Sequence, residues 1–152
     1  MEVAFGSVAG MSSPQVVTLA GRLITGAGGR QTRPRIDALT ALLEAGRTLS
    51  HAQLHERLPD VDRVSLYRAL DWLAEHHLAH RLTDADGVRR YGPSESPGDH
   101  HHAHFHCTGC GLTACLSKAL PPSITLPKGY RQAGVEVLVT GLCRDCAAVA
   151  RL

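Results

Sequence analysis

HHHAHFHCTGCGLTAC, which runs from His100 to Cys115, is the stretch around which the fold of this 152-residue chain is organised. It contains five histidines and three cysteines, and imidazole and thiolate are ligands that zinc prefers. The later stretch LCRDCA supplies a second Cys-x-x-Cys pair. Two such pairs provide the four thiolates of a closed tetrahedral zinc site. The predicted structural zinc ligands are Cys107, Cys110, Cys143 and Cys146.

The ligands that remain predict a second, separate metal site. Alternate residues of a strand point to the same side, so His102, His104 and His106 are expected on one face of an extended segment. The turn of the first Cys-x-x-Cys pair is expected to fold the next extended run, which carries Cys115, back alongside the first. For His100, His101 and His106 we expect a solvated or weakly metal-scavenging role.

Composition restricts the class of protein. The net charge of +2 gives no large basic tail, so any nucleic-acid-binding surface must be local. No apolar run is long enough to span a bilayer, and the opening MEVAFGSVAG does not resemble a secretory signal. Five cysteines placed as two pairs plus one favour reduced, metal-holding thiols over a disulfide framework. We therefore expect a cytoplasmic protein with a flexible leader at 1–12, in which Met11 is an alternative start.

Hydrophobic periodicity predicts four helices in the first half of the chain. The signals that begin them are, in order, Ser13 with Pro14, then Pro34, then Ser50 with Gln53, and finally Asp62. The signals that end the first three are Gly26, Gly46 and Pro59. The third and fourth helices are joined by a tight turn, which is the plan of a helix-turn-helix. The fourth presents Ser65, Tyr67, Arg68 and Asp71 beside its apolar stripe.

Two extended runs, 78–83 and 88–91, follow these helices and are joined by the turn Asp-Ala-Asp-Gly. This pattern predicts a hairpin and, with the helices, a winged helix-turn-helix domain. Positively charged side chains on the hairpin can bind DNA phosphates, and the candidates are Arg81, Arg89 and Arg90.

The second half is predicted to be a small sheet tied at one corner by the four cysteines. Extended runs are expected at 112–116, 124–126 and 130–133, and in the alternating Val135, Val137 and Val139. Such a small domain needs metal or a partner chain for stability. The predicted divisions are a leader at 1–12, a DNA-binding domain at 13–92, a hinge linker at 93–99 and a dimerisation and metal-binding domain at 100–152.

Together these motifs resemble the ferric uptake regulator family of bacterial metal-sensing repressors, and most of all its zinc uptake regulators. The resemblance runs from Ser13 to Cys146. It rests on TRPR at 32–35, VSLYR at 64–68, the wing, the His-x-His run and the two Cys-x-x-Cys pairs.

The resemblance implies an α+β homodimer whose winged helices read an AT-rich inverted repeat and whose small C-terminal α/β domains pair. Tyr67 and Arg68 match the DNA-contacting pair of the family, and Arg35 matches its phosphate-contacting arginine. Ser65 offers a hydroxyl from the same helix. The four paired cysteines match the structural zinc site of the family.

For the regulatory zinc, the resemblance implies a tetrahedral site that would bring the zinc count to two per subunit. The expected ligands are His80, His102, His104 and Cys115. Some zinc sensors place a cysteine where this chain has Ser94, so the thiolate has moved. His100 and Asp99 are reserve ligands. The alternatives are a half-buried, satisfied imidazole for His80 and a plain core thiol for Cys115.

Departures from the family pattern affect the other metal sites. The ligands of an auxiliary third site fall near Pro122 and Val135, so that site is expected to be absent. A glutamate common in the family is Gly92 here, which disfavours an oxygen-rich iron site. The predicted function is a DNA-binding repressor with zinc as corepressor that controls zinc homeostasis genes. A regulator of the same fold that senses iron, manganese or peroxide is the alternative.

Other classes of protein fit less well. A zinc hydrolase or deaminase needs an open coordination position and a general-base glutamate, and the deaminase pattern of His-x-Glu with Pro-Cys-x-x-Cys is missing. We therefore expect no enzymatic activity. A metal-storage protein would have no use for a winged helix.

Overall fold

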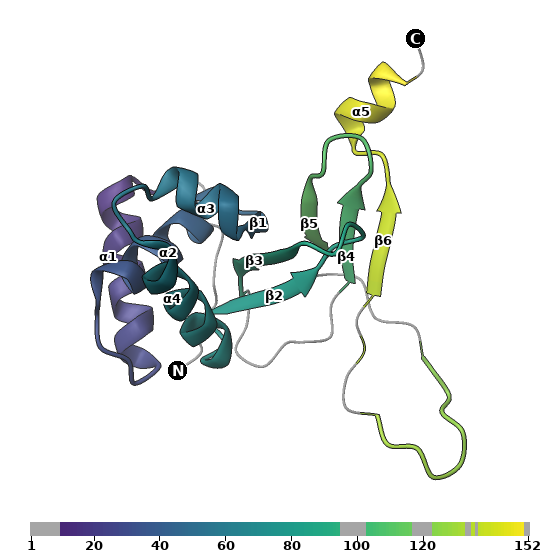
Figure 1. Cartoon of the computed structure of the whole chain (residues 1–152), viewed down its shortest axis with the longest axis horizontal. Coiled ribbons are helices and arrows are strands. Elements are labelled where there is room, and N and C mark those ends of the chain that lie inside the picture. The colour runs from purple at the N-terminus through teal and green to yellow at the C-terminus, as the bar shows by residue number, and fades with distance from the viewer. Residues whose placement is uncertain (1–9, 95–102, 117–122, 133–134, 136, 151–152) are drawn as a thin grey trace. The chain divides into compact units, whose positions relative to one another are not determined.

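The computed structural model describes residues 10–94, 103–116, 123–132, 135 and 137–150, except for the side chain of Cys115. The chain divides into two compact units, residues 1–98 and 99–152 (Figure 1). Most of the predicted leader, most of the predicted linker and His102 lie outside the described residues.

All four predicted helices of the N-terminal unit are confirmed. They are α1 (Ser13–Gly26), α2 (Arg33–Ala45), α3 (His51–Arg57) and α4 (Arg63–Glu75). The predicted cap of α1 was wrong by one residue, because Ser13 is already helical and Ser12 has the extended backbone of an N-cap. The Ser12 amide donates to the Gln15 side chain at 2.8 Å, which satisfies one of the amides at this end of the helix.

The ends of the other helices follow the sequence signals. Ser50 and Gln53 form a reciprocal capping box, with the Ser50 amide donating to Gln53 Oε1 at 2.9 Å. The Ser65 amide donates to Asp62 Oδ1 at 2.9 Å. Gly46 ends α2 with φ at +57°, a conformation that glycine adopts without steric cost.

A three-stranded antiparallel sheet completes the winged helix. The wing strands β2 (Ala79–Thr83) and β3 (Arg89–Pro93) form the predicted hairpin, and β1 (Leu49–Ser50) pairs with the other edge of β3. β1 was not predicted, because a strand of two residues is too short to show alternation. Its pairing places Leu49 opposite the fully buried Tyr91 and so ties the wing to the helices.

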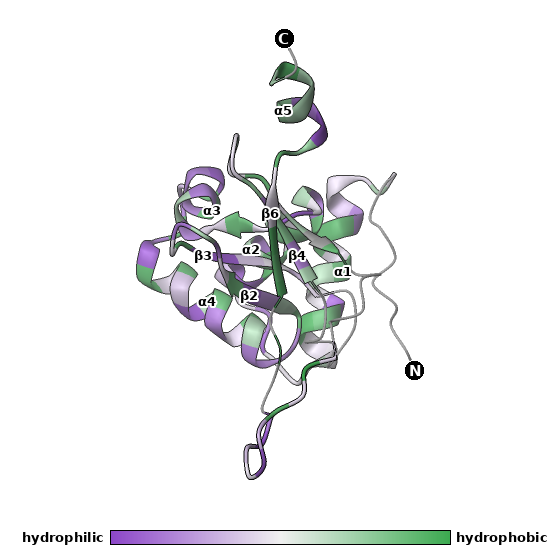
Figure 2. Ribbon diagram, turned by 90° about the vertical axis from the view of Figure 1, so that its right-hand side faces the viewer, coloured by the Kyte–Doolittle hydropathy of each residue, from purple (hydrophilic) through white to green (hydrophobic). Residues whose placement is uncertain are grey.

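One apolar core joins the helices to the sheet. α1, α2 and α4 each turn an apolar stripe inward, and the hydropathy colouring shows hydrophilic residues on the outer side of α4 (Figure 2). The fully buried side chains at its centre are Ile24, Leu39, Leu42, Leu49, Leu54, Leu66, Leu70, Leu73 and Tyr91.

Asp84 organises the wing turn and also locks Arg90. Its Oδ1 accepts from the amides of Asp86 and Val88, while its Oδ2 accepts from Arg90 Nε at 2.6 Å. Arg90 also donates to Gln53 Oε1 at 3.2 Å, and its side chain is only 11% exposed. Arg90 therefore braces the wing against α3, which differs from the phosphate-contacting role that its sequence position suggested.

The C-terminal unit is a three-stranded sheet followed by a short helix. β4 (Ala103–Cys107) lies between antiparallel β5 (Thr113–Leu116) and parallel β6 (Val137–Gly141). The strands expected at 124–126 and 130–133 were wrong for the described residues, since 123–132 form no regular structure beyond a turn at 128–129. α5 (Arg144–Val149) was not predicted, because six residues are too few for a periodic signal.

Among the helices that the structure describes, none combines the length and hydropathy that a membrane span requires.

The Asp84–Arg90 pair predicts a pH-dependent stability of the wing. Burial opposes ionisation of Asp84, but the hydrogen bond from Arg90, the Val88 amide and the charge of Arg90 outweigh it and lower the pKa. Because the folded pKa is depressed, this stabilisation is complete above the unfolded value of about 3.9 and is lost as pH falls through the folded pKa. We expect Asp84→Asn to lower the free energy of unfolding by about 3 kcal/mol at pH 7.

Urea unfolding followed by tryptophan fluorescence checks this, because Trp72 is the only tryptophan of the chain and lies in α4. The difference between wild type and Asp84→Asn should shrink below about pH 4. Asp86→Asn, in the exposed part of the same turn, is the control and should change little. A difference independent of pH would contradict the role of the Asp84 charge.

Candidate metal centre and DNA-binding surface

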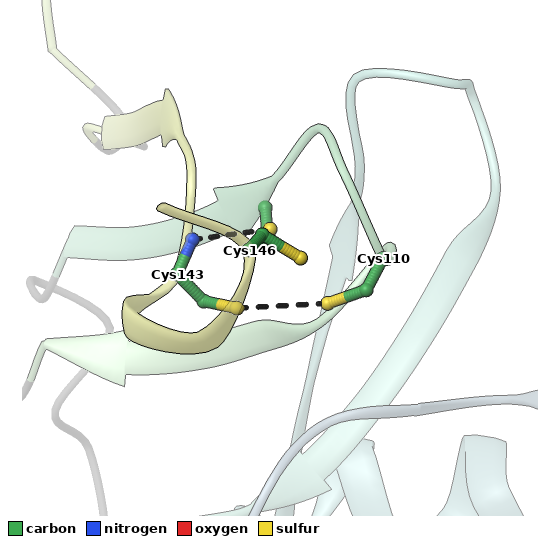
Figure 3. Close-up of side chains that lie close together, drawn as sticks. Cys110, Cys143 and Cys146 are labelled. Carbon is green, nitrogen blue, oxygen red and sulfur yellow. Dashed lines mark hydrogen bonds between the residues drawn. The ribbon is translucent and has the colours of Figure 1, made fainter. Parts of the chain in front are cut away.

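Four cysteines meet at one end of the C-terminal sheet. Cys107 is the last residue of β4, and Cys110 lies in the turn that follows it. Cys143 is the N-cap of α5, and Cys146 lies within that helix. In Figure 3 the labelled Cys110, Cys143 and Cys146 gather around a common centre. The four are free thiols.

Backbone hydrogen bonds hold the two Cys-x-x-Cys segments against each other. The Thr108 amide donates to the Gly141 carbonyl at 2.8 Å, and the Cys143 amide donates to Cys107 Sγ at 3.1 Å. Gly109 is packed closely here, because a Cβ at that position would lie 3.0 Å from Cys146 Sγ. The bond from Thr108 to Gly141 joins the two segments through their backbones, and the other two contacts involve the thiols themselves.

The spacing of the sulfur atoms suits zinc. All four Sγ atoms lie within 4.8 Å of one another, and Cys110 Sγ and Cys143 Sγ are 3.7 Å apart. A zinc ion with bonds of about 2.3 Å to four tetrahedral sulfurs requires sulfur pairs separated by about 3.8 Å. The four thiols thus fit the cation that the sequence predicts.

The four thiols and the nearby backbone amides shift the acidity of individual cysteines. The Cys143 amide is the largest cause that lowers the pKa of Cys107 to about 6. Hydrogen bonds with Cys143, Cys110 and Cys107 raise the pKa of Cys146 to about 12. The Leu112 amide lowers the pKa of Cys110, but hydrogen bonds with Cys107 and Cys143 outweigh it and the net shift is upward. Thiolates packed this closely repel one another, and a dication removes that penalty.

The predicted regulatory ligands are described only in part. The sheet register places Cys115 opposite His104, which is half-buried, while His102 lies outside the described residues. The solvated role expected for His106 was wrong. Its Nδ1 lies 3.0 Å from Oγ1 of the buried Thr113 on β5, so this imidazole has a side-chain partner within the sheet.

His80 is buried in the N-terminal unit on β2, directly opposite Gly92 of β3. A Cβ at Gly92 would lie 2.7 Å from His80 Cε1 and 2.9 Å from Thr48 Cγ2. The imidazole ring therefore occupies the space that a side chain at residue 92 would need. This explains locally why glycine accompanies a histidine at position 80.

Three of the four predicted DNA-contacting residues line one groove. Arg35 near the start of α2 and Ser65 and Arg68 on α4 border an open groove of about 240 Å³, together with Thr32, Pro34 and Ala69. Arg68 is exposed, while Arg35 and Ser65 are half-buried. Two guanidinium groups and a hydroxyl in one groove can bind phosphate oxygens.

Arg35 is oriented by contacts that sequence reasoning missed. Its guanidinium carbon lies 4.0 Å from the centroid of the Trp72 ring, and Nη1 donates to the Arg30 carbonyl at 3.1 Å. Trp72 also stacks on His76, with centroids 4.0 Å apart. The single tryptophan was the available signal, since a large aromatic residue on the α4 face that carries Arg68 needs a partner.

Tyr67 lies apart from that groove and is 46% exposed. Its ring stacks on His51 of α3, with centroids 3.5 Å apart and planes 9° from parallel. Both rings border a second groove of about 400 Å³, which is also lined by Arg63 and Arg89. The role of His51 was not anticipated from the sequence.

The four thiols predict one firmly held zinc ion in each chain. Cys146→Ala removes one ligand and leaves a three-sulfur site, so the variant should lose the zinc that wild type retains after dialysis against a chelator. We also expect it to unfold at a lower temperature, because metal binding and folding are coupled. Zinc content by atomic spectroscopy and thermal unfolding check this, with Cys115→Ala as the matched control that keeps the retained zinc. Equal zinc in wild type and Cys146→Ala would count against the four-thiolate assignment.

The close approach of His80 to Gly92 predicts that alanine is tolerated less well at Gly92 than at Gly26. Gly92→Ala should lower the free energy of unfolding by about 1–3 kcal/mol, because the buried ring and Thr48 must both move. Gly26→Ala is the control, since a Cβ there meets nothing within 4 Å and alanine favours the helix. Denaturant unfolding measures both variants, and an unchanged stability of Gly92→Ala would rule out the close packing described here.

Comparison with known proteins agrees with this architecture. Residues 26–120 match the model of the ferric uptake regulator family. A search of curated proteins returned no match.

Solved structures share the fold at low sequence identity. A zinc uptake regulator complexed with zinc and DNA is 19% identical, with a TM-score of 0.68 over 93% of this chain and 99% of that chain. The holo form of XcZur is 20% identical, with a TM-score of 0.59 over 90% and 99%. The Vibrio cholerae ferric uptake regulator is 18% identical, with a TM-score of 0.58 over 81% and 98%. The match to the family model shows that the chain belongs to the ferric uptake regulator family, and its winged helix and cluster of four cysteines agree with this.

Proposed function

We propose that the protein is a zinc-dependent, DNA-binding transcriptional repressor that controls genes of zinc uptake and homeostasis. The observation that carries the proposal is the groove in which Arg35 of α2 meets Ser65 and Arg68 of α4, the second helix of the helix-turn-helix. Helices of this motif place polar side chains against base edges while neighbouring cations hold the phosphates. Membership of the ferric uptake regulator family supports the same role and gives no support to an enzyme.

The exposed apolar surface of the C-terminal unit supports a homodimer. Among the described strands, β6 lies at one edge of its sheet and carries Leu138 and Val139, which are 39% and 43% exposed, and it is coloured as hydrophobic in Figure 2. Tyr130 and Val149 are each 71% exposed. Exposed apolar residues at the edge of a sheet are typical of surfaces that pair with another chain. Two winged helices held by such a dimer would bind two half-sites, which agrees with an inverted-repeat operator rich in AT.

The structural zinc would stabilise the unit that forms this dimer. Among the described residues, the buried hydrophobic side chains of the C-terminal unit are Ala103 and Cys107, which is too little apolar burial to stabilise a sheet. Zinc held by Cys107, Cys110, Cys143 and Cys146 fixes the ends of β4 and β6 to α5. The fit of the four sulfur atoms supports this assignment.

A second zinc would act as corepressor at His80, His102, His104 and Cys115. Two observations support part of this set: His104 and Cys115 are opposite each other in the sheet, and the His80 ring is held against Gly92. In the proposed mechanism the ion takes ligands from both units and favours the arrangement that binds DNA. By thermodynamic linkage, DNA then raises the affinity for zinc by the same factor.

Zinc is preferred over other metals because of the ligand chemistry. A thiolate at residue 115 and imidazoles suit zinc, whereas iron and manganese sensors rely more on oxygen ligands. Gly92 provides no such oxygen. A regulator that senses iron, manganese or peroxide with the same fold is the second candidate, and the fold of the Vibrio cholerae ferric uptake regulator is compatible with it.

Metal-dependent DNA binding tests the proposal directly. We expect zinc at low free concentration to switch on binding of the protein to its own promoter DNA, measured by fluorescence anisotropy under buffered free zinc, iron(II) or manganese(II). Cys115→Ala should require at least tenfold more free zinc, because one of four ligands is lost. Zinc content after chelation should match wild type, which separates the regulatory from the structural site.

Each result has a distinct meaning. Switching by iron or manganese would select the second candidate function. An unchanged zinc requirement in Cys115→Ala would remove Cys115 from the ligand set while leaving the DNA-binding role intact. Absence of DNA binding under every metal would overturn the proposed function.

A further inference from the structure

His51 and Tyr67 form a stacked pair across the helix-turn-helix. Their ring centroids are 3.5 Å apart and their planes differ by 9°, so the two rings are in face-to-face contact. His55 extends the stack, with its centroid 6.4 Å from that of His51 and its plane at 21°. Three rings from α3 and α4 thus form a short ladder that ends on Tyr67.

His51 is the fixed member of this ladder. It is the first residue of α3, directly after the Ser50 N-cap, so its backbone is set by the capping box. Its ring is half-buried and faces the Tyr67 ring of α4. The imidazole is therefore enclosed by its surroundings more than the Tyr67 ring, which is 46% exposed.

The surroundings lower the pKa of His51 and so favour its neutral form. Burial is the largest cause, the Arg63 backbone acts in the opposite direction, and the charges of His55 and Arg63 lower the pKa further. A neutral imidazole packs on a phenol ring without the desolvation cost of a buried charge.

We propose that His51 is a positioning residue for recognition of base sequence: it holds the Tyr67 ring in the conformation that meets the DNA bases. The inference rests on the proposed DNA-binding function and goes beyond it, because it assigns part of the sequence discrimination to a residue outside the recognition helix. Tyr67 and Arg68 are adjacent on α4 but border different grooves, so His51 acts on Tyr67 without contacting Arg68.

The physical basis is preorganisation. A free tyrosine side chain loses rotamer freedom when it docks on a base, and that loss weakens binding. The stack removes most of this loss before DNA arrives. Because phosphate contacts come from other side chains, His51 should affect sequence-specific affinity and leave the electrostatic part of binding unchanged.

The test compares two fluorescein-labelled duplexes with zinc-loaded full-length protein. One duplex is the tightest-binding sequence that wild type selects from random DNA, and the other is the same sequence shuffled. His51→Ala should weaken binding to the selected duplex roughly three- to tenfold, with shuffled-duplex affinity unchanged within about twofold. The slope of log affinity against log salt should match wild type.

Two further variants separate positioning from packing. His51→Phe keeps a flat ring that can stack on Tyr67 and should restore most of the discrimination. His51→Ala should add little in a Tyr67→Leu background, because the stack is already absent. His77→Ala, which removes an exposed imidazole after α4, is the control and should behave as wild type. Thermal unfolding of each variant verifies that the helices are intact.

Several outcomes would overturn the inference. Equal weakening on both duplexes, an undiminished effect of His51→Ala in Tyr67→Leu, or no rescue by His51→Phe would each show that His51 does not act through the tyrosine ring. If wild type showed no preference for any sequence, the inference and the proposed function would fall together. If wild type discriminates and His51→Ala discriminates equally, the inference alone falls.

Discussion

Convergence of four thiols from two segments far apart in the chain is the constraint on which the C-terminal unit depends. Cys110 and Cys143 are separated by 33 positions, yet their sulfur atoms are 3.7 Å apart. Among the described residues of this unit, the buried hydrophobic side chains are Ala103 and Cys107, far fewer than in the core of the N-terminal unit. The N-terminal unit is stabilised by leucines packed between its helices and its sheet. The described part of the C-terminal unit is organised by the four converging cysteines.

Within the N-terminal unit, polar contacts place the functional groups on the apolar framework. Arg90 links the wing to α3 through Asp84 and Gln53. Trp72 supports the guanidinium of Arg35 from below. Neither contact was evident from the sequence, because both join residues that are distant in the chain and that have ordinary surface roles in isolation.

Much of the fold could nevertheless be predicted. The helices could be predicted from hydrophobic periodicity together with their N-caps, such as Ser50 with Gln53 and Asp62 with Ser65. Both signals involve residues close together in the chain. The four cysteines could be grouped because their spacing is specific to metal binding.

Prediction failed where the signal was short or where tertiary contacts decide the structure. β1 and α5 are too brief for a period to be seen, and the apolar residues near Ile124 adopt no strand. His106 was assigned to the surface by its place in a histidine run, whereas its neighbour Thr113 gives it a buried partner.

The fit of the His80 ring over Gly92 couples these two positions through space alone, whatever either side chain binds. Any Cβ at residue 92 would require the imidazole and the Thr48 side chain to move. A larger residue at position 92 should therefore be accepted more readily when position 80 carries a smaller side chain. The effect of a substitution at one position is then defined only once the residue at the other is stated.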